Sequence, residues 1–135
     1  MAAMTNLRPT SLPSPDDILA EVRTCSETAV EAEGRAAQEK ASLPAEWDWS
    51  RFDDTARAAY RRMRAFEGMA FGLRAGRLSW LAQMMLCEAD LPALAAEVVA
   101  AIPDGYVTIS STCSTLNMLA ASRRAAGGGP GQAAL

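Results

Sequence analysis

The sequence contains no histidine, and its cysteines are few and far apart. Without histidine, catalytic triads that need an imidazole base and metal sites with imidazole ligands are excluded. The chain has three cysteines, Cys25, Cys87 and Cys113. Their odd number argues against a disulfide framework, and the absence of a CxxC pair argues against a zinc motif. No GxGxxG or Walker A string occurs either. We therefore expect no metal, no cofactor and no catalytic activity.

Long apolar runs are also missing. The longest strongly apolar stretch without a charge, residues 78–87, is about half as long as a membrane-spanning helix needs to be. The first fifteen residues lack the apolar segment of a secretion signal. Unpaired cysteines are typical of a reducing compartment. These observations predict a cytoplasmic protein that does not associate with a membrane.

Aromatic side chains are scarce and make up only 6% of the 135 residues. Half of the chain is hydrophobic, but many of those residues are alanine, which buries little surface. The predicted core of leucine, methionine, valine and alanine is therefore modest. A protein partner or a second copy of the chain could supply the missing burial.

The net charge of −3 hides a separation of charges along the chain. Residues 1–50 carry four basic and nine acidic side chains, residues 51–77 carry seven arginines against three acids, and residues 78–135 carry two basic and four acidic side chains. The acidic first third and the basic middle third are expected either to face each other or to face different partners.

Periodicity and capping residues predict a mostly helical domain over residues 14–126, between a flexible arm, 1–13, and a flexible tail, 127–135. Ser14, Ser50 and Asp90 are the expected helix caps. The expected helices cover residues 14–42, 50–76, 77–89, 91–102 and 114–126, the second and third being either separate or continuous. Residues 106–112 alternate between apolar and polar side chains and are rich in β-branched residues, so they are the one candidate for a short strand. The predicted fold is a small orthogonal or bundle-like arrangement of four to five helices with at most that strand.

One stripe of the second helix carries arginines that lead into glycines spaced four apart. Its members are Arg57, Arg61, Arg64, Gly68, Gly72 and Gly76. The glycines fit two interpretations: a notch that lets another backbone approach closely, or a simple loosening of the helix with Gly76 as its C-terminal cap. We predict the first, with the stripe facing away from the inward-facing Tyr60, Met63 and Phe66.

The arginines fit three interpretations: a solvated helix face, a contact with an acidic protein surface such as the chain's own first helix, or a contact with phosphates. Trp47, in the connector before this helix, is a candidate binding hot spot where it is partly exposed. A helix-turn-helix is disfavoured, because residues 102–110 form too long a turn.

These observations favour a protein-binding module, that is, an adaptor, an inhibitor or an accessory subunit, which binds a protein partner or forms a homo-oligomer. Its predicted contact residues are Trp47 and the stripe of arginines and glycines. The alternative is a nucleic-acid-binding regulator that uses the arginine-rich helix of residues 51–77.

Overall fold

The computed structural model describes residues 14–76, 78–103 and 106–127. Within these ranges the chain forms five α-helices and one 3₁₀ helix and no strand, which confirms the predicted helical fold. The elements are α1 (Pro15–Ala41), η1 (Trp49–Arg51), α2 (Asp54–Ala75), α3 (Trp80–Glu88), α4 (Leu91–Ala101) and α5 (Ile109–Gly127). The predicted arm, residues 1–13, and residues 128–135 of the predicted tail lie outside the described residues.

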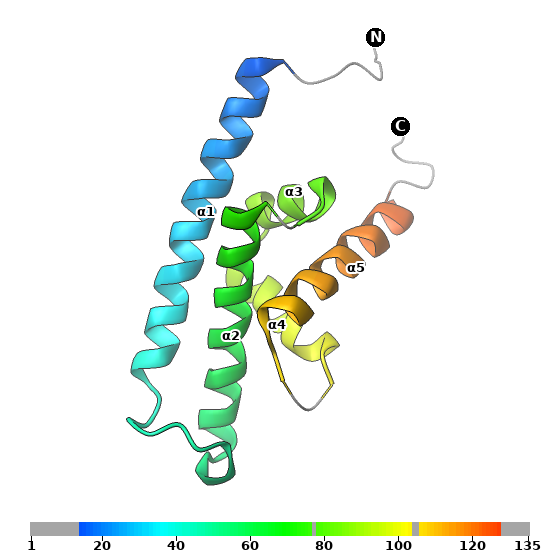
Figure 1. The fold of residues 1–135 in the computed structure, drawn as a ribbon. Coiled ribbons are helices and arrows are strands. Elements are labelled where there is room, and N and C mark those ends of the chain that lie inside the picture. The colour runs from blue at the N-terminus through cyan, green and yellow to red at the C-terminus, as the bar shows by residue number, and fades with distance from the viewer. Residues whose placement is uncertain (1–13, 77, 104–105, 128–135) are drawn as a thin grey trace.

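Helices α1 and α2 form a long antiparallel hairpin (Figure 1). Two bidentate ion pairs fix their register: Arg62 binds Glu39 near the connector, and Arg74 binds Glu33 further along. In an antiparallel pair, residue numbers on the two helices run in opposite directions, so α2 ends opposite the residues of α1 near 30. The preceding part of α1, residues 15–28, therefore extends past the end of α2, and at 1.5 Å per residue it is about 20 Å long. We call it the projecting half of α1.

Two predicted caps are confirmed and one is wrong. Ser14 begins α1 with a capping box, and Asp90 caps α4 by accepting a hydrogen bond from the Ala93 amide. The expected cap Ser50 lies instead inside η1, where its hydroxyl donates to the Asp48 carboxylate. Asp53 caps α2, because its carboxylate accepts from the amide of Ala56. A carboxylate is already favoured at the positive end of a helix, so Asp53 takes the place expected of Ser50.

Helices α4 and α5 pack on α2 and on each other, and α3 packs on α5 and α1, so that together they enclose the core (Figure 1). The buried centre joins side chains from four helices: Met63, Phe66, Met69, Leu86, Leu94, Val98 and Leu116. Helices α2 and α3 are separate, because Gly76 adopts a left-handed conformation, with φ 65°, that ends α2. This confirms the interpretation of Gly76 as a C-terminal cap.

The candidate strand at residues 106–112 does not form. Thr108 caps α5: its hydroxyl accepts from the Ser111 amide, and the Ser111 hydroxyl accepts from the Thr108 amide. Helix α5 therefore starts at Ile109, five residues before the predicted start. Serine and threonine side chains satisfy the free amides of a helix end, and here that contribution outweighs the β-propensity of the segment. Among the described helices, none is both long enough and apolar enough to cross a bilayer.

Candidate functional site

The predicted contact residues do not form one site. Trp47 and Arg57 lie at the connector end of the α1–α2 hairpin, and Gly76 lies at the opposite end of α2. The 22 residues of α2 separate the two ends by about 33 Å. A single partner surface covering the whole stripe would have to follow the full length of the helix.

The glycine stripe faces the interior rather than the outside, so its predicted orientation is wrong. Gly68 and Gly72 are buried, and α5 of the same chain covers them. A Cβ atom added to Gly68 would lie 2.7 Å from Thr112 Cβ, and one added to Gly72 would lie 2.9 Å from Leu78 Cγ and 3.2 Å from Cys113 Sγ. The glycines are thus a notch for close helix packing, as predicted, but the helix in the notch is the chain's own α5. Methionine and phenylalanine on the neighbouring stripe pack against the core as well, so α2 is buried over a wider arc than its apolar side chains indicate.

The three arginines of the stripe each contact groups of the same chain. Arg57 donates to the Trp49 carbonyl and lies over the Trp49 ring, 5.0 Å from its centroid. Arg61 donates to the carbonyls of Val99 and Ile102, at 3.0 and 2.7 Å, and so binds the negative end of α4. Arg64 forms an ion pair with Glu67 on the next turn.

The acidic first third and the basic middle third face each other across the α1–α2 hairpin, one of the two predicted arrangements. The Arg74 guanidinium, through its hydrogen bonds and its charge, lowers the pKa of the Glu33 carboxyl. The Glu39 carboxylate likewise raises the pKa of Arg62. Both shifts favour the charged forms, so the pairs persist at neutral pH.

Aromatic side chains gather at the connector, and Trp47 is partly exposed among them. The Trp47 and Trp49 rings contact Tyr60 edge-on, with centroids 5.6 and 5.7 Å apart, and Phe52 lies buried beneath them. The Lys40 ammonium lies 5.6 Å from the Trp47 centroid. Trp47 is therefore held by its neighbours while 46% of its surface stays accessible.

The projecting half of α1 exposes a cluster of large apolar side chains. Ile18, Leu19 and Val22 are 45%, 60% and 58% exposed, and we call these three residues the apolar end. Helical spacing places Ile18 and Val22 on the same stripe as the buried alanines Ala29, Ala32 and Ala36, which pack on α2. The stripe that α2 covers thus continues beyond the end of α2 without that cover.

The same half of α1 is acidic. Between residues 15 and 28 there are four carboxylates and one arginine, namely Asp16, Asp17, Glu21, Glu27 and Arg23. Asp16 and Asp17 lie at the positive end of the helix dipole, where carboxylates are favourable. The apolar end is therefore flanked by negative charge.

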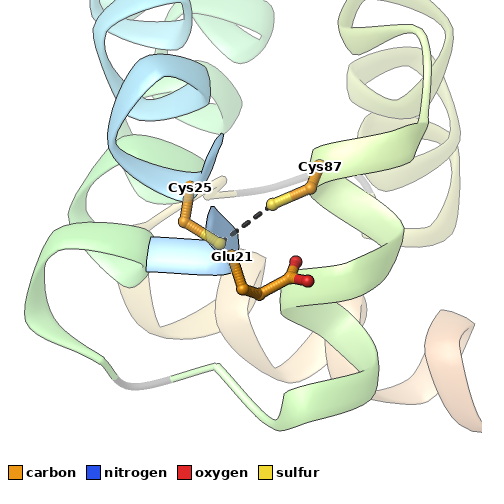
Figure 2. A group of neighbouring side chains, drawn as sticks. All are labelled: Glu21, Cys25 and Cys87. Atoms are coloured by element: carbon orange, nitrogen blue, oxygen red, sulfur yellow. Dashed lines mark hydrogen bonds between the residues drawn. The ribbon is translucent and has the colours of Figure 1, made fainter. Parts of the chain in front are cut away.

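Two cysteines and a glutamate meet where the projecting half passes α3 (Figure 2). Glu21 and Cys25 lie one turn apart on α1, and Cys87 is near the end of α3. The two sulfur atoms are 2.9 Å apart, and one carboxylate oxygen of Glu21 lies within 4.8 Å of both. All three side chains are partly buried. Burial, and next the contact with Cys25, raise the pKa of the Cys87 thiol, and the Glu21 charge adds to the increase.

Sequence reasoning found neither the apolar end nor the thiol–carboxylate cluster. The spacing of Glu21 and Cys25 places them on one face of α1, but Cys87 is 62 residues further along than Cys25. Only the packing of α3 on α1 brings them together.

No protein-family model, curated protein or solved structure matches the chain.

Proposed function

We propose that this chain is a cytoplasmic protein-binding module without catalytic activity, and that it binds a different protein through the apolar end of α1. The observation that supports this most directly is the exposure of Ile18 and Val22 on the stripe of α1 that is buried further along, with the exposed Leu19 beside them. Full burial of such a side chain contributes roughly 1.5–3 kcal/mol, and because about half of each is still exposed, covering all three would contribute about half of that for each.

The charge around the apolar end favours a basic partner over a second copy of the chain. In a symmetric dimer through this face, the carboxylates of both copies would approach one another, at an electrostatic cost. A partner with an apolar helix or groove flanked by lysine or arginine would instead complement Asp16, Asp17 and Glu27. Trp47, at the far end of the hairpin, is a separate exposed anchor and is not needed for this contact.

Nucleic acid binding through the arginines of residues 51–77 has less support. Arg57, Arg61 and Arg64 contact a ring, two carbonyls and a carboxylate of the chain. Phosphates would have to share or replace these contacts. The net charge of −3 also opposes a polyanion.

Position-specific crosslinking tests the proposed surface. A photoreactive amino acid at position 22 should capture a distinct protein in the native cells, and the same probe at position 30 should not. Val30 is the matched control, because it is on the same helix, is similarly exposed at 59%, and lies beyond the projecting half. The captured protein, once purified, should bind the unmodified chain with a measurable affinity.

Substitutions then connect the captured protein to the apolar end. Val22→Glu should weaken binding at least tenfold, which corresponds to about 1.4 kcal/mol, and Val30→Glu should not. Equal effects of the two substitutions would refute the proposed surface. Dimerisation that depends on Val22, measured by sedimentation, would replace the different protein with a second copy of the chain.

A further inference from the structure

The cluster of Glu21, Cys25 and Cys87 has the composition of a metal site. We propose that these three residues bind one thiophilic divalent metal ion, and that Zn²⁺ is the ion that suits them best. Thiolates and carboxylates are both ordinary zinc ligands, and two thiolates select against hard cations such as Mg²⁺ and Ca²⁺. This inference does not depend on the proposed partner.

The positions of the ligand atoms fit one tetrahedral ion with a small movement. Sulfur atoms about 2.3 Å from a tetrahedral ion lie about 3.8 Å apart. The sulfur atoms of Cys25 and Cys87 are 2.9 Å apart, so they would separate by less than about 1 Å. The carboxylate oxygen of Glu21, within 4.8 Å of both sulfurs, supplies the third ligand from the adjacent turn of α1. Figure 2 shows all three side chains converging on the space between α1 and α3.

A fourth ligand can come from solvent. A cavity of about 450 Å³ adjoins the cluster, and Glu21 and Cys25 are among the residues that line it. A water molecule could reach the ion through this cavity. Three protein ligands and one water make a recognised zinc coordination.

The carboxylate distinguishes a metal site from a disulfide. A disulfide would use the two sulfur atoms and leave Glu21 beside them with no role. In the metal-free chain the Glu21 charge contributes to the raised pKa of the Cys87 thiol and so opposes its ionisation. A divalent cation reverses this effect, because it offsets the charges of two thiolates and one carboxylate together. The ion would also link the projecting half of α1 to α3.

Metal titration of the reduced, metal-free chain tests the site. Co²⁺ should bind at one ion per chain and give the near-ultraviolet absorption of thiolate-to-cobalt charge transfer, and Zn²⁺ should displace it. Cys25→Ser and Cys87→Ser should each abolish this absorption. Glu21→Gln should lower the zinc affinity by at least about tenfold, the smallest loss usual even for groups that only support a ligand.

Two controls isolate the proposed ligands. Glu27→Gln removes an exposed carboxylate from the same helix, and Cys113→Ser removes the remaining thiol; both should bind zinc like the unmodified chain. Far-ultraviolet circular dichroism confirms that each variant is folded.

Three results would overturn the assignment. The first is the absence of cobalt binding at millimolar metal in the reduced chain. The second is zinc affinity unchanged by Glu21→Gln, which would remove the carboxylate from the ligand set. The third is failure of the reduced chain to bind zinc while the Cys25 and Cys87 thiols oxidise to one disulfide in air, which would make the cluster a redox pair instead.

Discussion

Replacing Gly68 by alanine should destabilise the fold, although the same change normally strengthens a helix. Alanine in a helix interior is favoured over glycine by about 1 kcal/mol. At Gly68, however, the added methyl group would lie 2.7 Å from Thr112 Cβ, 2.8 Å from its Oγ1 and 2.9 Å from its Cγ2. A Cβ atom cannot rotate away, so α5 itself has to move. Such overpacking costs about 1–3 kcal/mol, which leaves a net loss of up to about 2 kcal/mol.

Gly34 and Gly72 calibrate this effect. Gly34 is exposed in α1, and in the described part of the chain no neighbouring atom lies within 4 Å of a Cβ atom added to it. Gly34→Ala should therefore stabilise the chain by up to about 1 kcal/mol. At Gly72 the close atoms are Cγ and Cδ2 of Leu78 and Sγ of Cys113, which lie beyond Cβ and can shift by side-chain rotation more easily than Thr112 Cβ can. We therefore expect stability to decrease in the order Gly34→Ala, Gly72→Ala, Gly68→Ala.

Urea unfolding followed by far-ultraviolet circular dichroism measures these differences, provided that the slopes with denaturant agree. Sedimentation should show the same association state for all three variants, because the notch is filled from within the chain. If Gly68→Ala were as stable as Gly34→Ala, α5 would not pack in the notch. If Gly68→Ala instead changed association and left stability unaltered, the glycines would belong to an intermolecular contact.

Three further predictions follow from single contacts. Arg61→Met should destabilise the chain by about 2 kcal/mol in urea unfolding, because two charge-assisted hydrogen bonds to α4 carbonyls are lost, whereas Arg64→Met should cost less than about 1 kcal/mol. Thr112→Val should raise the unfolding free energy by about 1 kcal/mol, because the fully buried Thr112 hydroxyl has no hydrogen-bond partner among the residues that the structure describes; a loss of stability would contradict this. DNA binding, measured by fluorescence anisotropy across a range of salt concentrations, should be weak throughout, and submicromolar affinity at physiological salt would contradict the proposed function.

The features that the sequence predicted correctly depend on neighbouring residues. The serine–proline pair at Ser14, the carboxylate at Asp90 and the glycine at Gly76 each satisfy or end a helix within one turn. The predicted start of α5 was wrong for a related reason. Residues 106–112 have β-propensity, but Thr108 and Ser111 can cap one another only when a helix begins between them. Two local preferences compete there, and the composition of the segment does not reveal which one prevails.

The orientation of the glycine stripe depended on packing between distant segments. A search for large apolar side chains assigns the inward face of α2 to Tyr60, Met63 and Phe66, and glycine has no side chain to add to that pattern. The notch became visible only with α5 in place, because Gly68 contacts Thr112 across 44 positions of the chain. The contact of Cys25 with Cys87 joins residues that are further apart still, by 62 positions. Periodicity identifies which residues share a face, but it does not identify what covers that face.

The end of α2 divides α1 into two parts with different tasks. Beyond Ala29, the alanines of α1 allow α2 to approach closely, and Glu33 and Glu39 hold it in register through Arg74 and Arg62. Before Ala29, the same stripe carries larger side chains, and this part of α1 holds four carboxylates and one arginine. Ile18 and Val22 line a cavity beside the end of α2 and α3, but 45% and 58% of their surfaces stay exposed. A helix that served only the hairpin would gain little from that exposure, since exposed apolar groups lower solubility. Large apolar side chains at Ile18 and Val22, on a helix built with alanine elsewhere along that stripe, therefore favour a contact surface over an unused end.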